Sequence, residues 1–380
     1  MLLTKLFTDF FESERAGGLL LIACTAISLI LTNVGFGEAY VSFWQTMYAG
    51  HSIEHWINDG LMTVFFLLIG LELEREIYIG ELASLRDAML PLFAAVGGIV
   101  VPAGLYMYFN YGTDTQSGAG IPMATDIAFA LGILSLLGNR VPTSLKVFLT
   151  ALAVIDDLGA IIIIALFYTK TIIWSNLLWA LGIFLGLLVL NRLKVRNLIP
   201  YLMAGIAMWY FMLNSGVHAT ITGVLLAFAI PFGDGGEKST SYILQNFLHK
   251  PVAFFVLPVF ALANTAIPLS GNLGHVFTAA YSIGIGSGLI LGKPMGIFLM
   301  AYLAVKLKIS NLPDDINWKS VLGVGFLGGI GFTMSIFITL LAFDEPTLIN
   351  SAKFIILISS IVAGGIGYLS LRLTLRSDGV

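Results

Sequence analysis

The chain has 380 residues, of which 58% are apolar and only 11% are charged, and its mean hydropathy is +0.93. Soluble globular domains carry about 25% charged residues, so the composition excludes a soluble domain and indicates a protein that crosses a membrane several times. The net charge of −3 and the lack of a Lys/Arg-rich block give no reason to expect a nucleic-acid partner. The single cysteine, Cys24, excludes an intramolecular disulfide and a cysteine-based metal site.

Apolar runs of about 17–25 residues, bounded by charged or turn residues, are typical of transmembrane helices. The sequence predicts twelve of them, at approximately residues 16–32, 59–79, 88–109, 120–138, 145–168, 172–191, 197–213, 216–232, 251–268, 278–305, 319–343 and 351–373. The first has the outline of a signal peptide, but acidic residues precede it and no A-x-A site follows it, so we interpret it as a retained span. The tight junction at 213–216 predicts either that spans seven and eight form a hairpin or that the number of predicted spans is wrong by one.

The basic residues predict the orientation of these spans. With both termini in the cytoplasm, sixteen of the 19 basic residues fall on the inner side, and only Lys170 and Lys353 fall on the outer side. The remaining one, Lys293, falls in the middle of span ten. Because cytoplasmic loops are enriched in Lys and Arg, we expect a multi-pass membrane protein with both termini in the cytoplasm.

Two spans are interrupted by glycine and polar residues. Span four contains Pro122 and Asp126, and span eleven contains a glycine run from Gly323 to Gly331 that is followed by Thr333. Such a pattern indicates a helix that unwinds to line a cavity. For either span alone, close helix packing explains the glycines equally well. Because spans three to five and spans ten to twelve each contain one interrupted member, we predict inverted repeats with a site at their interface.

Two adjacent carboxylates mark the centre of span five. Asp156 and Asp157 lie at the midpoint of the apolar run 145–168, where an ionised carboxylate costs roughly 2.5–3.5 kcal/mol on insertion scales. Successive helical residues are rotated by about 100°, so the two side chains cannot face the same point. Asp126 and Lys293 are the expected partners, since each is alone at mid-depth in its own span. We therefore predict an ion or proton site.

Competition between a cation and protons for these carboxylates suggests antiport. Carboxylates bind hard cations, and they lose that affinity when they are protonated. An exchange of two protons for one Na⁺ would also move net charge. An intramembrane aspartyl protease needs carboxylates that converge from different elements, a cation channel needs a ring of weak ligands, and an organic-anion symporter needs a roomier site. We therefore expect a transporter and not an enzyme, with no cofactor.

Five further residues are candidates for a response to pH. Glu72, Arg75 and Glu76 share one face at the cytoplasmic end of span two, which predicts either a charged funnel mouth or an ordinary solvated helix end. His218 lies near the outer face, where titration would modulate activity, but we favour a structural, hydrogen-bonded histidine. His249 precedes span nine. No pair of histidines has the spacing of a zinc or iron site.

Five motifs, taken in order along the chain, carry a resemblance to a known family. They are Ala124–Gly132, Ala153–Ala160, Ser215–Thr220, Gly292–Gly296 and Gly329–Phe337. With them the chain resembles the NhaA-type sodium/proton antiporters over nearly its whole length. The resemblance implies an all-α protein of about 12 transmembrane helices, two of them broken and crossing, in the inner membrane of a bacterium.

The resemblance also implies a division of the chain and roles for the charged residues. An ion-transporting core is expected at residues 88–171 and 278–376, and a scaffold and dimerisation bundle at 1–87 and 172–268. Roles are implied for Asp157 as the principal Na⁺, Li⁺ and proton ligand, Asp156 as the second carboxylate, Thr125 as an oxygen ligand, Lys293 as the salt-bridge partner of Asp156, and Asp126 as the compensation for positive helix ends.

Two segments depart from the family pattern. Well-studied members carry an acidic residue and a histidine ahead of span nine, whereas this chain retains only His249 in the segment 244–250. The segment 40–58 is shorter than the part of the family that forms a dimer-stabilising β-hairpin. We therefore expect a homodimer that is weaker or differently made.

Overall fold

The computed structural model describes residues 2–169, 171–269 and 273–375 and confirms an all-α membrane protein. Within these ranges nine helices are long and apolar enough to cross a membrane, or ten when the bent pair α16 and α17 is taken as one span. Two shorter helices, α9 and α10, stand where spans seven and eight are predicted. The described residues therefore form helices at all twelve predicted positions, and nine or ten of these helices are long enough to cross a membrane.

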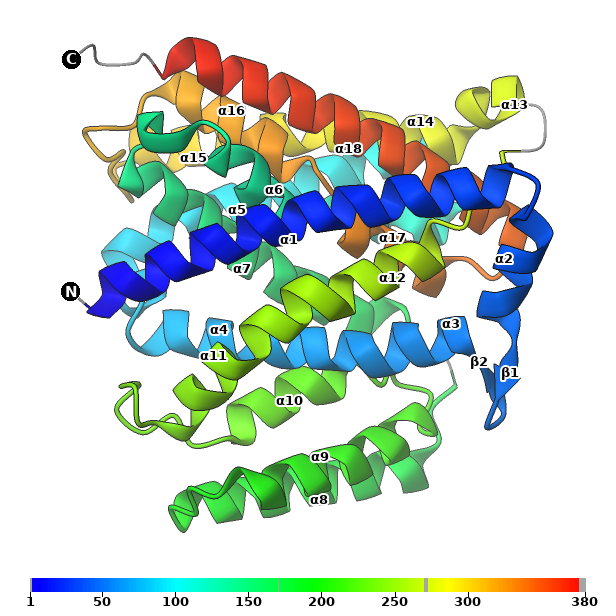
Figure 1. Ribbon diagram of the computed structural model, residues 1–380. Helices are drawn as coiled ribbons and strands as arrows, with labels where there is room; N and C mark the ends of the chain where they lie inside the picture. Colours follow the sequence, from blue (N-terminus) through cyan, green and yellow to red (C-terminus); the bar gives the residue numbers. More distant parts are fainter. Residues whose placement is uncertain (1, 170, 270–272, 376–380) are drawn as a thin grey trace.

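The elements follow one another as a chain of helices with one small hairpin (Figure 1). The first half comprises α1 (Leu2–Asn33), α2 (Gly37–Gln45), β1 (Met47–Tyr48), β2 (His51–Ser52), α3 (Ile53–Trp56), η1 (Ile57–Leu61), α4 (Met62–Tyr78), η2 (Glu81–Ala83), α5 (Leu85–Asn110), η3 (Gln116–Met123), α6 (Ile127–Ser135), η4 (Gly138–Arg140), α7 (Thr143–Phe167) and α8 (Trp174–Arg192). The second half comprises α9 (Leu198–Leu213), α10 (Ile221–Ala229), α11 (Thr240–Pro251), η5 (Val252–Val256), α12 (Leu257–Asn264), α13 (Leu273–Thr278), α14 (Ala280–Ser287), η6 (Gly288–Gly292), α15 (Lys293–Lys306), α16 (Trp318–Gly328), α17 (Phe332–Ala342) and α18 (Pro346–Thr374).

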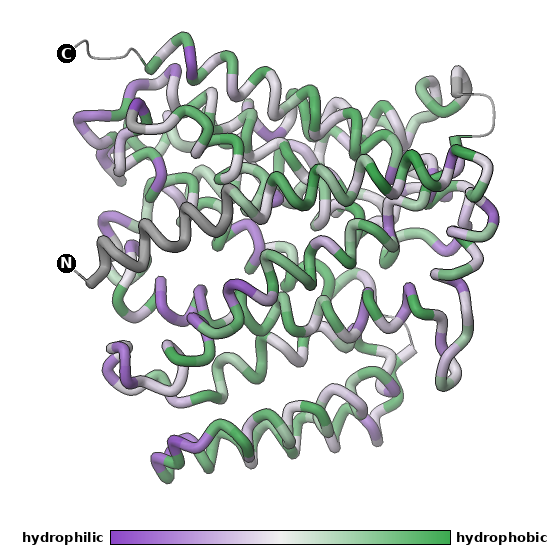
Figure 2. Tube along the Cα trace, viewed as in Figure 1, coloured by the Kyte–Doolittle hydropathy of each residue, from purple (hydrophilic) through white to green (hydrophobic). Residues whose placement is uncertain are grey.

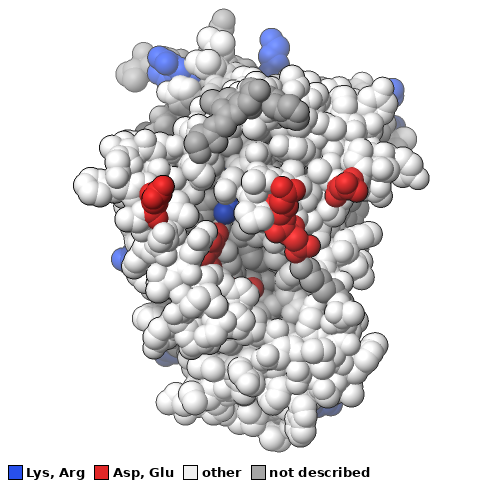
Figure 3. All heavy atoms as spheres, turned by 90° about the vertical axis from the view of Figure 1, so that its right-hand side faces the viewer, with Lys and Arg blue, Asp and Glu red and all other residues white. Residues whose placement is uncertain are grey.

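The bundle has two ends with different charge. The two chain termini lie at one end, here called the termini end, and strands β1 and β2 lie at the other, here called the hairpin end (Figure 1). Hydrophobic residues run along the helices, and hydrophilic residues gather mainly at the two ends (Figure 2). Figure 3 shows the hairpin end with several acidic groups and few basic ones around a hollow. This distribution agrees with the predicted asymmetry of the basic residues.

Span eight is shorter than predicted. Helix α10 covers only Ile221–Ala229, whereas the prediction was 216–232. Residues 214–220 form turns instead, and Gly216 adopts a φ of +85°. A Cβ at Gly216 would lie 2.1 Å from the Thr171 carbonyl oxygen. The glycine is therefore required by both its conformation and its close contact.

A small hairpin does form in the short segment that follows α2. Met47 pairs with Ser52 and Tyr48 pairs with His51 in antiparallel register. Each strand has only two residues, so the exposed edge is much shorter than the five or six residues of an average strand.

Helices α5 and α15 cross in close contact through a pair of glycines. A Cβ at Gly97 would lie 2.0 Å from the Gly296 carbonyl oxygen, and a Cβ at Gly296 would lie 2.1 Å from the Gly97 carbonyl oxygen. Small residues let the backbones of membrane helices approach in this way. Lys293 lies about one turn before Gly296 on α15, so this crossing positions the lysine.

Replacing Gly296 with Val should therefore destabilise the protein. The added side chain forces α15 away from α5, and overpacking of this kind costs about 1–3 kcal/mol. We expect a lower thermal unfolding midpoint for the detergent-solubilised protein. Gly365→Val in α18 is the control, because nothing lies within 4 Å of a Cβ at Gly365. Equal midpoints for the two variants would contradict this assignment.

Candidate ion-binding site

The two interrupted helices meet in the middle of the bundle. Helix η3 ends at Met123 and α6 begins at Ile127, while α16 ends at Gly328 and α17 begins at Phe332. Pro122 stands just before the first break, where its missing N–H and fixed φ favour a helix end. The backbone N–H of Asp126 donates to the Ile330 carbonyl at 2.6 Å, and α16 and α17 are bent by 47°. Both breaks therefore leave helix ends at one point.

Asp126 binds the N-terminal ends of both half-helices that begin here. Its Oδ1 accepts from the Phe129 N–H at 3.1 Å, at the start of α6. Its Oδ2 accepts from the Thr333 N–H at 2.9 Å and from the Thr333 hydroxyl at 2.5 Å, at the start of α17. A helix N-terminus carries a partial positive charge. The buried carboxylate of Asp126, which is 2% exposed, is thus matched by two of them.

Lys293 and Asp156 form an ion pair beside the crossing of the two interrupted helices. The Lys293 Nζ lies 2.5 Å from Asp156 Oδ2, and both side chains are fully buried. Lys293 also donates to the carbonyl of Met123, the last residue of η3. Because the C-terminal end of a helix carries a partial negative charge, the ammonium group is stabilised by that helix end as well as by the carboxylate.

Thr125 lies between this ion pair and the other broken helix. Its hydroxyl oxygen is 2.6 Å from Asp156 Oδ2 and 2.8 Å from the carbonyl oxygen of Gly328 at the end of α16. A hydroxyl has a single proton, so it donates to one of these oxygens at a time. Hydroxyl, carboxylate and carbonyl oxygens therefore converge beside Asp156.

Asp157 has different surroundings from its neighbour. It is 1% exposed, and neither of its carboxylate oxygens has a hydrogen-bond partner within the part of the chain that the structure describes. The same is true of Asp156 Oδ1. Buried polar groups are normally hydrogen-bonded, so these three oxygens are the exception that points to a ligand or a proton.

Neither aspartate reaches bulk water in this conformation, because Asp156 and Asp157 are each about 1% exposed. Access from either membrane face therefore requires a movement of the surrounding helices.

Sequence comparisons identify the family. The family described as "Na+/H+ antiporter 1" matches residues 8–371. The chain is 70% identical over 377 residues to the Na(+)/H(+) antiporter NhaA of Flavobacterium psychrophilum, covering 99% of this chain and 98% of that protein. It is 58% identical to the NhaA of Cytophaga hutchinsonii, covering 99% and 97%, and 57% identical to that of Dechloromonas aromatica, covering 99% and 98%. The chain belongs to the Na⁺/H⁺ antiporter 1 family. Members of this antiporter family are transporters and not enzymes, as expected.

The three charged residues predicted to share one face of α4 lie at its termini end. Glu72 Oε1 is 3.8 Å from the His249 Nε2 of α11, and the Arg75 guanidinium lies over the ring of Tyr242 at 5.1 Å from its centroid. Glu76 accepts from the Glu81 N–H at 3.0 Å. All three α4 residues are half-buried, so each contacts another element. They do not form an ordinary solvated helix end.

His218 lies far from these residues, at the hairpin end. Its Nε2 is 2.9 Å from the carbonyl oxygen of Tyr168, directly after α7. The Tyr168 hydroxyl in turn donates to the Ser117 carbonyl at 2.8 Å. The histidine is therefore hydrogen-bonded and joins the turns before α10 to the end of α7, which is the structural interpretation that the sequence favoured.

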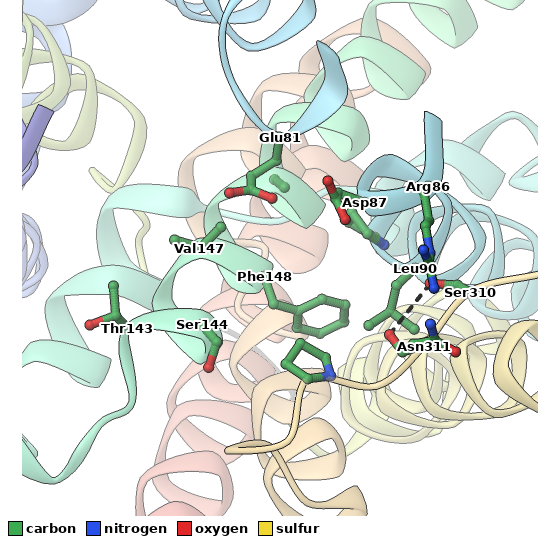
Figure 4. Close-up of a pocket in the computed structure, with 13 residues that line it drawn as sticks. Glu81, Arg86, Asp87, Leu90, Thr143, Ser144, Val147, Phe148, Ser310 and Asn311 are labelled. Atoms are coloured by element: carbon green, nitrogen blue, oxygen red, sulfur yellow. Dashed lines mark hydrogen bonds between the residues drawn. The ribbon is translucent and has the colours of Figure 1, made fainter. Parts of the chain in front are cut away.

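A pocket of about 290 Å³ opens at the starts of α5 and α7 (Figure 4). Its lining includes Glu81, whose pKa is raised by burial and further by the charge of Asp87. On α7 the pocket follows one face, from Thr143 through Val147 to Ala151. The α7 lining ends at Ala151, five residues or about 7.5 Å of helix before Asp156, and neither aspartate lines the pocket. The pocket therefore does not include the aspartate site.

Two buried charged residues were missed by the sequence analysis. Glu74 is 4% exposed and accepts from the Ser241 hydroxyl at 3.3 Å. Glu74 lies two positions from both Glu72 and Glu76, so it is on the other face of α4. This spacing was visible in the sequence. Lys353, which we counted among the charges of the outer side, is 4% exposed inside the protein. Its position near the end of an apolar run gave no such signal.

Replacing Asp126 with Ala should destabilise the protein more than the loss of an ordinary helix cap. It removes the acceptor of three hydrogen bonds at two helix ends, and hydrogen bonds to charged groups contribute about 1.5–3 kcal/mol. We expect a loss of about 3 kcal/mol or more, measured as a lower thermal unfolding midpoint. Ser239→Ala, which removes the single cap of α11, should cost about 1 kcal/mol. Equal midpoints would mean that Asp126 does not hold the crossing.

Proposed function

We propose that this chain is an electrogenic Na⁺/H⁺ antiporter, which also accepts Li⁺ and exports the cation in exchange for protons by alternating access at Asp156 and Asp157. The observation that carries the proposal is the buried carboxylate of Asp157, which has no hydrogen-bond partner among the described residues and stands beside an ion-paired carboxylate. Membership of the Na⁺/H⁺ antiporter 1 family supports it.

The energetics of Asp157 require a positive partner. An ionised carboxylate without a partner costs several kcal/mol when it is buried. A proton or a small cation removes this cost, and the same oxygens cannot hold both. Loading by Na⁺ therefore expels a proton from Asp157, and loading by a proton expels Na⁺. This competition is the chemical basis of the proposed exchange.

The oxygens around Asp156 suit a small hard cation. Asp156 Oδ1 has no hydrogen-bond partner in the described ranges, and the Thr125 hydroxyl and the Gly328 carbonyl lie close to the other oxygen of Asp156. Hard cations prefer oxygen ligands of these kinds, and carbonyls at unwound helices coordinate ions in related transporters. Asp157, Asp156 and Thr125 are therefore the proposed ligands of Na⁺ or Li⁺. Because the two aspartates leave α7 about 100° apart, a shared cation requires their side chains to turn towards each other.

The pair of Lys293 and Asp156 accounts for electrogenic exchange. A cation that binds both aspartates takes Asp156 from Lys293, and the lysine ammonium, which then lacks its counter-ion, releases the second proton. With the proton from Asp157, two protons exchange for one Na⁺, and one net charge moves. The membrane potential of a bacterial inner membrane contributes about 2.3 kcal/mol per charge for each 100 mV, so it drives export.

Alternating access requires the crossing to move relative to its surroundings. We assign residues 88–171 and 278–376 to the moving core, and residues 1–87 and 172–268 to the scaffold, which forms a homodimer. The termini end faces the cytoplasm because it carries most of the basic residues. The mouth formed by Glu72, Arg75, Glu76 and His249 then lies on the cytoplasmic side. Activity rises with pH because deprotonation frees the aspartates for Na⁺.

Asp157→Asn should abolish exchange while leaving the fold intact, because the amide keeps the shape but cannot hold a proton or balance a cation. Everted membrane vesicles energised by respiration should lose part of their pH gradient when Na⁺ or Li⁺ is added to the native protein. The signal should grow towards alkaline pH and be absent in the variant. Asp234→Asn, on an exposed loop, is the matched control and should behave as the native protein.

A second flux assay, in proteoliposomes, tests the charge movement. With K⁺ on both sides, valinomycin removes the potential that net charge transfer creates, so it should accelerate Na⁺-driven proton flux in proteoliposomes. Equal flux in Asp157→Asn and native protein would reject the assigned ligand, and a rate that ignores valinomycin would reject electrogenic exchange.

A further inference from the structure

The hairpin end contains a cavity of about 780 Å³, and Figure 3 shows this end hollowed and rimmed by acidic groups. One wall comes from the proposed scaffold, with residues of α3, η1 and the turns before α10. The other wall comes from the proposed core, with residues of α17 and α18. The lining residues used below are Glu54, Asn58, Ala219, Phe337 and Lys353. Core and scaffold thus face each other across this cavity.

Lys353 crosses this boundary. It belongs to α18, its side chain is only 5% exposed, and its Nζ lies 3.5 Å from Glu54 Oε1 of α3. The Nζ is also 3.3 Å from Asn264 Oδ1 at the end of α12. A lysine buried to this degree is held by its partners, because removing one partner leaves an uncompensated charge. Both partners belong to the scaffold.

The scaffold side of this contact is itself fixed. The Asn264 side-chain amide donates to Asn58 Oδ1 at 2.7 Å and to the Phe260 carbonyl at 3.0 Å. Asn264 Oδ1 is thereby directed towards Lys353. We name the four residues Glu54, Asn58, Asn264 and Lys353 the hairpin-end latch.

An aromatic contact lies at the floor of the cavity. The rings of Phe66 on α4 and Phe337 on α17 are 5.5 Å apart between centroids, and both side chains are 1% exposed. Phe337 is four residues, or about 6 Å of helix, beyond Thr333, which binds Asp126. The cavity therefore ends about one helical turn from the crossing, closed by a core residue against a scaffold residue.

We propose that the hairpin-end latch holds the outer side of the transport route closed, and that Lys353 must leave Glu54 and Asn264 each time the aspartate site opens outwards. This inference rests on the alternating access proposed above. Separating a buried charge from its partners is unfavourable, so the latch shifts the equilibrium towards the inward-facing state. A ligand that binds only the outward-facing state then shows an affinity reduced by the fraction of that state.

The test is the apparent Na⁺ affinity measured separately at each membrane face, in everted and right-side-out vesicles. Lys353→Met keeps a long apolar side chain but cannot bind Glu54 or Asn264. We expect the half-saturating Na⁺ concentration at the outer face to fall about fivefold or more, with an unchanged or higher value at the inner face. A general loss of stability would not lower the half-saturating Na⁺ concentration at the outer face alone. Lys306→Met, at an exposed lysine over Tyr302, is the control and should change neither value.

A second measurement does not need transport. With Cys24 replaced by Ala, a cysteine is placed at Ala219, which lines the cavity but is 2% exposed. A membrane-impermeant maleimide added from outside should label it several times faster when Lys353→Met or Glu54→Gln is also present. The exchanged pair Glu54→Lys with Lys353→Glu should return labelling towards the native rate.

The outcomes separate the latch from the antiport itself. Unchanged affinities at both faces together with unchanged labelling, in a protein whose Na⁺-dependent flux is lost in Asp157→Asn, would overturn the latch alone. Parallel changes at both faces would also overturn it. A native protein without Na⁺-dependent proton flux would overturn the proposed function, and the latch with it.

Discussion

The fold depends on charge compensation at the point where two unwound helices cross inside the membrane. In lipid, each freed backbone group and each charge must find a partner within the protein. Here Asp126 binds two helix N-termini, and Lys293 binds one helix C-terminus and Asp156. The close contact of α5 and α15 at Gly97 and Gly296 places Lys293 beside this crossing.

This arrangement leaves one carboxylate, that of Asp157, without a partner in the described structure. Every other charge at the crossing is matched, so a cation or a proton at Asp157 changes the balance of the whole group. In the proposed exchange the ion pair of Asp156 and Lys293 is the part that changes, because a cation that takes Asp156 releases the lysine. The proposal thereby connects cation binding to the helix ends at the crossing, and the proposed latch at the hairpin end acts on the same movement from a distance.

The sequence predicted much of this because the signals were local. Charges at mid-span and glycine runs identify Asp126, Asp156, Asp157 and Lys293 without knowledge of the fold, and apolar length gives the spans. It did not predict that α10 is short, since turn formation by residues 214–220 depends on the contact of Gly216 with the backbone of a distant segment. Nor did it predict the burial of Lys353, which depends on Glu54 and Asn264 from helices far away in the chain.

In the proposed exchange, Na⁺ and protons exclude each other from one group of buried oxygens. The most direct measurement is the release of protons from the purified protein in weakly buffered detergent solution, followed with a pH indicator as Na⁺ is added. We expect a saturable release that is absent in Asp157→Asn and absent when choline replaces Na⁺. Saturable Na⁺ binding without proton release, or equal release from the variant, would contradict it.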